Sequence, residues 1–328
     1  MQYRRFGKTD LIVSEIGYGT WGIGGVVNNM MSYGPRDDKL SEKSLKLAYD
    51  LGINFFDTAS SYGFGHSELM LGKTFSKKRD KLIIATKAGF LNSFSTEKNQ
   101  DFSAKGIELS VNNSLKRLKT DYIDLFQLHS PDKNHLLNND KLFSLLDKFK
   151  KQGAIRYVGL AAKTPNDAKD ILSLYDFDSV QTNFNLTDMR IIDNGLSKYI
   201  SKNKIALITR TPLVYGFLTG VFNSSSKFHK TDHRNRFAKE QIDMWCSAIT
   251  EYKDNFENLD ETYTLAQKAI KFCLSFDMVS TVLSGMDISK YVTENLRSSN
   301  LDYLSNRDLE EIYEKYTKLF KNFSMKMK

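Results

Sequence analysis

Short apolar runs rich in β-forming residues alternate with longer amphipathic stretches along the chain, and this pattern occurs eight times. The expected strands lie at residues 15–19, 53–56, 82–86, 123–128, 155–160, 179–182, 205–209 and 279–283. Stretches with helical periodicity lie between them, including residues 42–50, 106–118, 136–150, 166–174 and 261–276. Such alternation predicts repeated strand–helix units around a parallel sheet.

The number of units decides between two folds with parallel sheets. Eight strand–helix units in 328 residues fit a closed (β/α)8 barrel, or TIM barrel. An open dinucleotide-binding sheet would begin with a glycine-rich turn that opens its first helix, whereas the glycine-rich run 17–25 leads into an irregular polar segment. We therefore predict one α/β barrel domain over residues 1–328, with an N-terminal hairpin at residues 3–13 and long loops at the carboxyl face. The polar run 219–240 has the length of a lid or a disordered loop.

Composition excludes several classes of protein. Cys246 and Cys273 have no paired spacing, so we expect neither a disulfide framework nor a zinc site. The net charge is +8, but the basic residues are scattered and no nucleic-acid-binding motif is present. The chain has no apolar run long enough to span a membrane, and its start is too polar for a signal peptide. We expect a cytoplasmic protein with a small-molecule substrate, no metal, no nucleic-acid partner and no membrane partner, and the oligomeric state stays open.

Four polar residues follow the carboxyl ends of three consecutive predicted strands. Asp57 comes directly after the second strand and Tyr62 lies in the loop beyond it. Lys87 comes after the third strand and His129 after the fourth. The carboxyl ends of barrel strands share one face, where the connecting loops build active sites. We therefore expect these four side chains to converge.

The chemistry of these four residues suits reduction of a carbonyl by an external hydride. A tyrosine with a pKa of ~10 is a poor acid at neutral pH, and a nearby ammonium stabilises its phenolate form. A carboxylate keeps that ammonium charged, and a histidine on the opposite wall can donate a hydrogen bond to the carbonyl oxygen. Tyr62 is thus the expected proton donor. Each residue type alone is more often structural than catalytic, so the prediction depends on the combination.

The segment 56–68, which reads FDTASSYGFGHSE, resembles the aldo-keto reductase superfamily and its bacterial branch, and Lys87 and Leu128-His129 fit the same pattern. The resemblance extends from Arg5 to about Asn295. It implies an NAD(P)H-dependent oxidoreductase that reduces an aldehyde, ketone or sugar carbonyl. The implied catalytic tetrad is Asp57, Tyr62, Lys87 and His129.

The resemblance also assigns cofactor and substrate residues. For the cofactor it implies Asp57 and, in the turn after the first strand, Gly19, Thr20 and Trp21. Gln181 is the implied ligand of the carboxamide, and Arg210 is the implied guanidinium that stacks on the nicotinamide ring. The implied pyrophosphate loop contains Leu213, Gly216, Leu218 and Gly220, and the implied adenine-binding pair is Glu294 and Asn295. For the substrate we expect His129 and an aromatic-walled pocket: Trp21, Tyr33, Phe64 and Phe90. Gly216 and Gly220 could equally serve turns. The run Asp232-His233-Arg234 could reach a ligand phosphate or be a solvated charge cluster.

One departure from the superfamily concerns the nicotinamide. Members usually have Ser-Asn after the fifth strand, where the pair binds the carboxamide. This chain has Ala161 and Ala162 at these positions. Gln181 is therefore expected to be the main side-chain ligand of the carboxamide.

A second departure concerns the adenosine ribose. Members that prefer NADPH carry Lys or Arg after the eighth strand, whereas this chain has Asp287 and Tyr291, and Lys290 is the basic residue that could substitute. A carboxylate near the ribose favours a free 2′-hydroxyl over a phosphate. The superfamily and the basic run 219–240 favour NADPH. We therefore expect NADP(H) narrowly ahead of NAD(H).

Two other functions are compatible with the resemblance. The first is a cofactor-binding regulatory subunit that resembles the potassium-channel β subunits. The second is a sugar-modifying enzyme that uses a bound cofactor without net turnover. The complete tetrad favours a working reductase, and the sequence does not identify the physiological substrate or the direction of the reaction.

Overall fold

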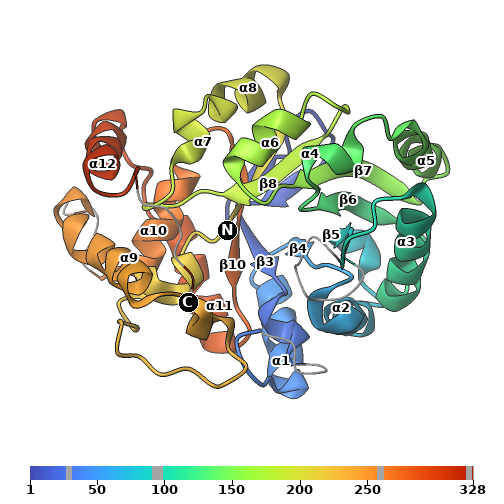
Figure 1. The fold of residues 1–328 in the computed structure, drawn as a ribbon. Coiled ribbons are helices and arrows are strands. Elements are labelled where there is room, and N and C mark those ends of the chain that lie inside the picture. Colours follow the sequence, from blue (N-terminus) through green and yellow to red (C-terminus); the bar gives the residue numbers. More distant parts are fainter. Residues whose placement is uncertain (27–31, 91–98, 257–261, 323–326, 328) are drawn as a thin grey trace.

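The structure, a computed structural model, describes residues 1–26, 32–90, 99–256, 262–322 and 327. Within these residues, eight parallel strands close into a barrel that helices surround (Figure 1). Neighbouring strands follow the order β10 (Val279–Gly285), β3 (Ile16–Gly19), β4 (Phe55–Asp57), β5 (Ile83–Ala88), β6 (Ile123–His129), β7 (Ile155–Ala161), β8 (Ser179–Asn183) and β9 (Ala206–Arg210). The predicted (β/α)8 fold class is confirmed, and each predicted strand agrees with one of these to within about two residues at either end.

The helices on the outside of the barrel follow the predicted pattern with some changes in length. They are α1 (Asp38–Asp50), α2 (His66–Thr74), α3 (Ala104–Leu118), α4 (Lys133–Leu136), α5 (Asp140–Lys151), α6 (Pro165–Ile171), α7 (Arg190–Asp193), α8 (Leu196–Asn203), α9 (Lys239–Glu251), α10 (Leu265–Leu274), α11 (Ser289–Leu296) and α12 (Asn306–Leu319). The predicted helix 136–150 is divided, because Asn139 caps α5 by accepting a hydrogen bond from Leu142 N. The predicted helices 166–174 and 261–276 are shorter, as α6 and α10, and Glu261 lies outside the described residues. Among the described helices, none combines the length and the apolar character that crossing a membrane requires.

The interior of the barrel is apolar at one end and polar at the other. Phe55, Ala85 and Leu125 belong to an apolar cluster inside the barrel. Because side chains on one face of a strand recur every two residues, the next inward positions on β4, β5 and β6 lie nearer the carboxyl ends of the strands. These positions carry Asp57, Lys87 and Gln127. The alternation therefore places polar side chains directly beyond the apolar cluster.

The N-terminal hairpin closes the apolar end of the barrel. Its strands, β1 (Tyr3–Arg5) and β2 (Ile12–Ser14), pair antiparallel, and Figure 1 shows the N-terminus within the ring of barrel strands. Gly7 has a φ of +55°, and a Cβ there would lie 2.6 Å from Ala206 N, so the hairpin turn requires glycine to approach the barrel. Arg4 forms an ion pair of 3.3 Å with the buried carboxylate of Glu15. The hairpin therefore covers the barrel end opposite Asp57, Lys87 and Gln127.

Candidate active site

Asp57, Lys87 and Tyr62 form one hydrogen-bonded cluster at the carboxyl end of the barrel. Asp57 ends β4, and Lys87 lies near the end of β5, which pairs with β4. The Lys87 ammonium donates to Asp57 Oδ2 at 2.6 Å, to the Thr58 carbonyl oxygen at 2.8 Å and to Tyr62 OH at 3.2 Å. Three of the predicted tetrad residues are thus in contact, and each of the three donor positions of the ammonium has a partner.

The Lys87 ammonium is charged although it is fully buried. Burial by itself would lower the pKa of Lys87. The charges and hydrogen bonds of Asp57 and Tyr62 outweigh this effect and raise the pKa of Lys87 above its ordinary value. Because both members of the Asp57–Lys87 ion pair are buried, removal of either one would leave an uncompensated charge inside the barrel.

Tyr62 begins a short 3-10 turn, η2 (Tyr62–Gly65), that leads into α2. Gly63 has a φ of +56°, and a Cβ there would lie 2.2 Å from the Gly24 carbonyl oxygen, so the turn passes directly against the loop after β3. Arg117 of α3 packs against the other side of the turn and forms an ion pair of 2.6 Å with buried Glu68. Contacts on two sides therefore hold the turn that carries the phenol.

His129 ends β6 and lies beside this cluster. Its ring centroid is 6.0 Å from that of Tyr62 and 4.8 Å from that of Phe90. Burial, followed by the charges of Lys87 and Arg210, holds the pKa of His129 well below its ordinary value. The ring is therefore neutral at neutral pH. Its Nδ1 is buried and has no hydrogen-bond partner among the described residues.

Two glutamine side chains hold the second carboxylate oxygen of Asp57. Gln127 Nε2 and Gln181 Nε2 donate to Asp57 Oδ1 at 3.0 Å and 2.9 Å. Gln181 is a residue predicted from the sequence, whereas sequence reasoning missed Gln127. The signal was present, because Gln127 precedes His129 by two residues and so shares its face of β6.

Arg210 and Asn183 form a second polar group next to Gln181. The two residues are paired in the register between β8 and β9. Arg210 Nε donates to Asn183 Oδ1 at 2.8 Å, and its Nη2 donates to the Lys163 carbonyl oxygen at 2.6 Å. These bonds fix the plane of the guanidinium at the end of β9. Asn183 is a further residue that sequence reasoning missed, although it shares the inward face of β8 with Gln181.

The predicted aromatic residues divide into separate groups. Trp21 and Tyr33 meet edge to face with a centroid distance of 5.0 Å. Phe90 packs against His129. Phe64 is 40% exposed on the η2 turn, and within the described part of the chain no ring contact joins it to the others. The predicted aromatic residues therefore form two groups, Trp21 with Tyr33 in the loop after β3 and Phe90 with His129 beyond β5 and at the end of β6, and Phe64 lies at the surface.

Residues 219–240, which we call the lid, are joined to the loop after β3. His233 N donates to the Ser32 carbonyl oxygen at 2.9 Å, and Ser32 N donates in turn to the lid backbone at 3.2 Å. The His233 ring lies 4.5 Å from the ring of Trp21 and 4.7 Å from that of Tyr33, measured between centroids. The lid is therefore ordered, and it packs against two of the predicted substrate residues.

Within the lid, Asp232 and Arg234 form a largely buried ion pair, whereas Lys227, Lys230 and Arg236 are exposed. Asp232 is 2% exposed, and Arg234 Nη2 lies 2.7 Å from its Oδ2. The Arg234 guanidinium also lies 4.2 Å from the ring centroid of Phe228 and 4.6 Å from that of Phe222. The alternative of a solvated charge run is therefore wrong for this pair, because Asp232 balances the charge of Arg234 within the lid. Contact of this segment with a ligand phosphate stays a prediction.

The predicted pyrophosphate loop directly follows β9. Leu213, Gly216, Leu218 and Gly220 lie in or beside the 3-10 segment η5 (Val214–Thr219). Gly216 and Gly220 have φ values of +93° and +78°, a conformation that favours glycine. No described atom lies within 4 Å of a Cβ placed at Gly220, so the backbone is open on that side.

The other predicted cofactor residues lie on adjacent elements. Thr20 follows Gly19 at the end of β3, and its Oγ1 donates to the Asp57 carbonyl oxygen at 3.0 Å. Glu294 and Asn295 lie on α11, where Asn295 Nδ2 donates to Ser284 Oγ at 2.8 Å. The amide of Asn295 is thus engaged in holding α11 to the end of β10.

The two departures from the superfamily have clear structural settings. Ala161 and Ala162 are fully buried and offer no polar side chain at the end of β7. Asp287 Oδ2 lies 3.0 Å from Arg36 Nε, and both side chains are largely buried. The carboxylate of Asp287 is therefore neutralised by a cation whose position, far away in the sequence, could not be foreseen.

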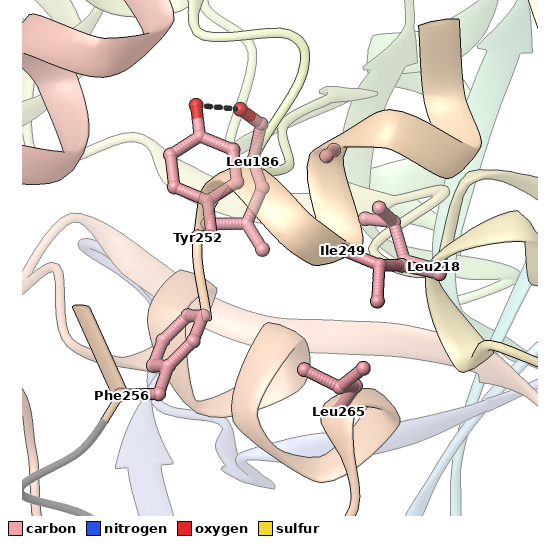
Figure 2. A pocket seen from close by; sticks show the side chains of 7 residues that line it. Leu186, Leu218, Ile249, Tyr252, Phe256 and Leu265 are labelled. Carbon is pink, nitrogen blue, oxygen red and sulfur yellow. Dashed lines mark hydrogen bonds between the residues drawn. The ribbon is translucent and has the colours of Figure 1, made fainter. Parts of the chain in front are cut away.

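Two cavities lie away from the Asp57–Lys87–Tyr62 cluster. A cavity of about 10 Å³, with space for about one water molecule, is lined by apolar side chains of η5, α9 and α10 together with Leu186, Tyr252 and Phe256 (Figure 2). The Tyr252 hydroxyl at its edge already donates to the Leu186 carbonyl oxygen at 2.8 Å. A groove of about 450 Å³ near Lys8 and Asp176 lies at the hairpin end of the barrel. The described residues also contain no group of three or more side chains that could hold a metal ion.

The chain is similar to known proteins over nearly its whole length. The model of the family described as "Aldo/keto reductase family" matches residues 15–317. Aldo-keto reductase YhdN from Bacillus subtilis is 33% identical, over 76% of this chain and 75% of YhdN. NADH-specific methylglyoxal reductase from Escherichia coli is 27% identical, over 92% of this chain and 94% of the reductase. The structure of glycerol dehydrogenase AKR11B4 from Gluconobacter oxydans superimposes with a TM-score of 0.80 at 27% identity, over 98% of this chain and 97% of the dehydrogenase.

Proposed function

This chain is an oxidoreductase that belongs to the aldo/keto reductase family, and on that premise we propose that it reduces an aldehyde, ketone or sugar carbonyl to an alcohol with Tyr62 as the proton donor. Members of the family use the nicotinamide cofactors NADPH or NADH. The observation that carries the proposal is the position of a buried, charged ammonium 3.2 Å from a phenol at the carboxyl end of a barrel.

The residues at this end of the barrel fit a nicotinamide cofactor. The guanidinium of Arg210 is held in one plane by Asn183 and the Lys163 carbonyl oxygen, and a planar cation suits stacking on an aromatic ring. The open glycine backbone of Gly220 suits close approach of a phosphate group. When bound, the cofactor supplies the hydride that reduces the carbonyl carbon.

In the proposed reaction Tyr62 gives its phenolic proton to the carbonyl oxygen of the substrate. The Lys87 ammonium, which already donates to Tyr62 OH, stabilises the phenolate that remains. Asp57 fixes the position of the ammonium through its Oδ2, and Gln127 and Gln181 hold the other oxygen of Asp57. Substitution of Asp57, Gln127 or Gln181 would therefore affect Tyr62 by shifting the position of the Lys87 ammonium.

We assign to His129 the task of orienting the substrate carbonyl. Its pKa is held well below the ordinary value by burial and by the nearby cations Lys87 and Arg210, so the ring acts in its neutral form. Nδ1 is buried and has no partner among the described residues, and we therefore place the ring proton on Nε2. A hydrogen bond from Nε2 to the carbonyl oxygen would then direct that oxygen toward the phenol.

For the cofactor we propose NADP(H), with NAD(H) as the alternative. Arg36 neutralises Asp287, so the carboxylate does not present an isolated negative charge to a 2′-phosphate. Against NADP(H) stand the balanced charge of Arg234 in the lid and the name of the Escherichia coli relative. The preference between the two cofactors is therefore tested by measuring kcat/KM with NADPH and with NADH.

The test is a panel of aldehydes, ketones and sugars assayed with NADPH and NADH in parallel. The proposal predicts turnover of at least one carbonyl with net consumption of the reduced cofactor. Tight binding of cofactor without turnover of any carbonyl would contradict it and would favour a regulatory subunit. Turnover of a sugar without net cofactor consumption would replace it with an enzyme that retains its cofactor through an internal redox step.

A further inference from the structure

Two amide side chains two residues apart, Gln181 and Asn183, lie on the inward face of β8, and each is only half used by the protein. Gln181 donates through Nε2 to Asp57 Oδ1 at 2.9 Å. Asn183 accepts through Oδ1 from Arg210 Nε at 2.8 Å and from Thr211 Oγ1 at 3.2 Å. Within the described part of the chain, Gln181 Oε1 and Asn183 Nδ2 have no hydrogen-bond partner.

The chemistry of the partners fixes the orientation of both amides. A carboxylate accepts hydrogen bonds, so the NH2 group of Gln181 must face Asp57 and its oxygen must face away. A guanidinium can only donate, so the oxygen of Asn183 must face Arg210 and its NH2 group must face away. The inward face of β8 therefore presents one free acceptor and one free donor in a defined order.

A ligand that satisfies both groups must carry a hydrogen-bond donor and a hydrogen-bond acceptor, and a primary amide carries both. The neighbouring strand β7 cannot supply these contacts through side chains, because Ala161 pairs with Gln181 in the register and Ala162 follows it. Arg210, beside Asn183 on β9, presents a flat cation that suits an aromatic ring. An aromatic ring that bears a primary amide therefore matches all three residues.

We propose that Asn183 Nδ2 and Gln181 Oε1 together bind the carboxamide of the nicotinamide ring, with Asn183 donating to its carbonyl oxygen and Gln181 accepting from its NH2 group. The inference rests on the proposed function, because it requires a nicotinamide cofactor at this end of the barrel. It assigns to Asn183 the donor that neither alanine on β7 can provide. Gln181 keeps its contact with Asp57 while it does so, which couples the ring position to the tetrad.

The decisive variant is Asn183→Asp. The aspartate retains an acceptor for Arg210 and Thr211 but replaces the Nδ2 donor with an oxygen that repels the carboxamide carbonyl. Loss of one such hydrogen bond and burial of an unpaired acceptor should weaken binding of NADPH or NADH about tenfold. The matched control is Thr211→Val, which removes a contact to Asn183 Oδ1 and leaves Nδ2 unchanged, and it should bind the cofactor as the wild type does.

The dissociation constants are measured by fluorescence titration and calorimetry, without any substrate. NADPH and NADH are compared with 2′-phospho-ADP-ribose and ADP-ribose, which lack the nicotinamide. The inference predicts weaker binding of the whole cofactors by Asn183→Asp and unchanged binding of the two fragments. The reduced 3-acetylpyridine analogue, which keeps the carbonyl and lacks the NH2 group, should show the same loss in this variant.

Three results would overturn the inference. Equal affinity of Asn183→Asp and wild type for the whole cofactor would remove the proposed donor. An equal loss for cofactor and fragment would show that Asn183 acts through the framework of the site. Failure of the wild type to bind either reduced cofactor would refute the proposed function itself, so the two failures are distinguishable.

Discussion

Replacement of His233 by phenylalanine should make the protein less sensitive to mild acid. The His233 ring is 8% exposed, and it packs against the rings of Trp21, Tyr33 and Tyr215. Burial lowers the pKa of His233 from 6.5 to about 4, although its hydrogen bond to the Ser32 carbonyl oxygen and the charge of Asp232 act in the opposite direction. The nearby cations Arg234 and Arg236 lower it further.

The direction of the effect on stability follows from where the proton binds. Between pH 6.5 and about 4 the unfolded chain protonates this histidine and the folded protein does not, so stability falls as the pH is lowered. The full difference between the two pKa values corresponds to about 3 kcal/mol. Of this, about 2 kcal/mol develops between pH 7 and pH 5.

The assay compares unfolding of the wild type and of His233→Phe at pH 7 and pH 5. His129, whose pKa is also lowered, is present in both proteins and cancels from the comparison. The wild type should lose about 2 kcal/mol relative to the variant, or about 3 °C in Tm for a chain of this length. His233→Asn, which keeps a donor for the Ser32 carbonyl oxygen, should depend on pH as His233→Phe does and should also lack the loss of about 2 kcal/mol seen in the wild type. A stability difference that is identical at both pH values would refute the assignment of a buried neutral His233.

Three further predictions concern the site. Lys87→Met should lower kcat at least about a hundredfold while cofactor affinity is retained. It should also destabilise the fold by about 3 kcal/mol, because Asp57 is left buried without its cation. A kcat close to that of the wild type would exclude Lys87 from the proton step. Burial, and then the charges of Lys87 and Arg210, lower the pKa of His129, so protonation of His129 should not reduce kcat/KM between pH 7 and pH 6. A decrease in kcat/KM centred near pH 6.5 that disappears in His129→Asn would contradict a neutral His129 ring. Asp287→Asn should free Arg36 from its ion pair and raise the ratio of kcat/KM for NADPH to that for NADH about threefold. An unchanged ratio would show that Arg36 and Asp287 lie away from the ribose.

The sequence was sufficient for the barrel and for bringing Asp57, Tyr62, Lys87 and His129 to one end of it. Strand–helix alternation is a local property of the chain, and the carboxyl ends of barrel strands meet whatever the details of packing. Asp57 and Lys87 could therefore be placed together from their positions at strand ends alone. Gln127 and Asn183 share the faces of His129 and Gln181 through the two-residue period, so a stricter use of strand alternation would have found them.

The remaining features depend on contacts between distant segments. The ion pair of Arg36 with Asp287 joins the loop after β3 to the loop after β10, and nothing near either residue in the sequence indicates the partner. The burial of Asp232 depends likewise on Ser32, which lies about two hundred residues earlier in the chain. The composition of the lid predicts a basic, polar segment, whereas in the structure the guanidinium of Arg234 packs against the rings of Phe222 and Phe228.

The role of Tyr62 as proton donor is tested most directly by single-turnover reduction with Tyr62→Phe and the best carbonyl found in the panel. We predict that the rate of hydride transfer falls by a factor of about 10² to 10⁴, while the dissociation constant for the reduced cofactor stays close to that of the wild type. Tyr157→Phe, which removes a hydroxyl that binds Asp10 at the far end of the barrel, is the control and should react normally. Hydride transfer at the wild-type rate in Tyr62→Phe would contradict the assignment of this phenol as the proton donor.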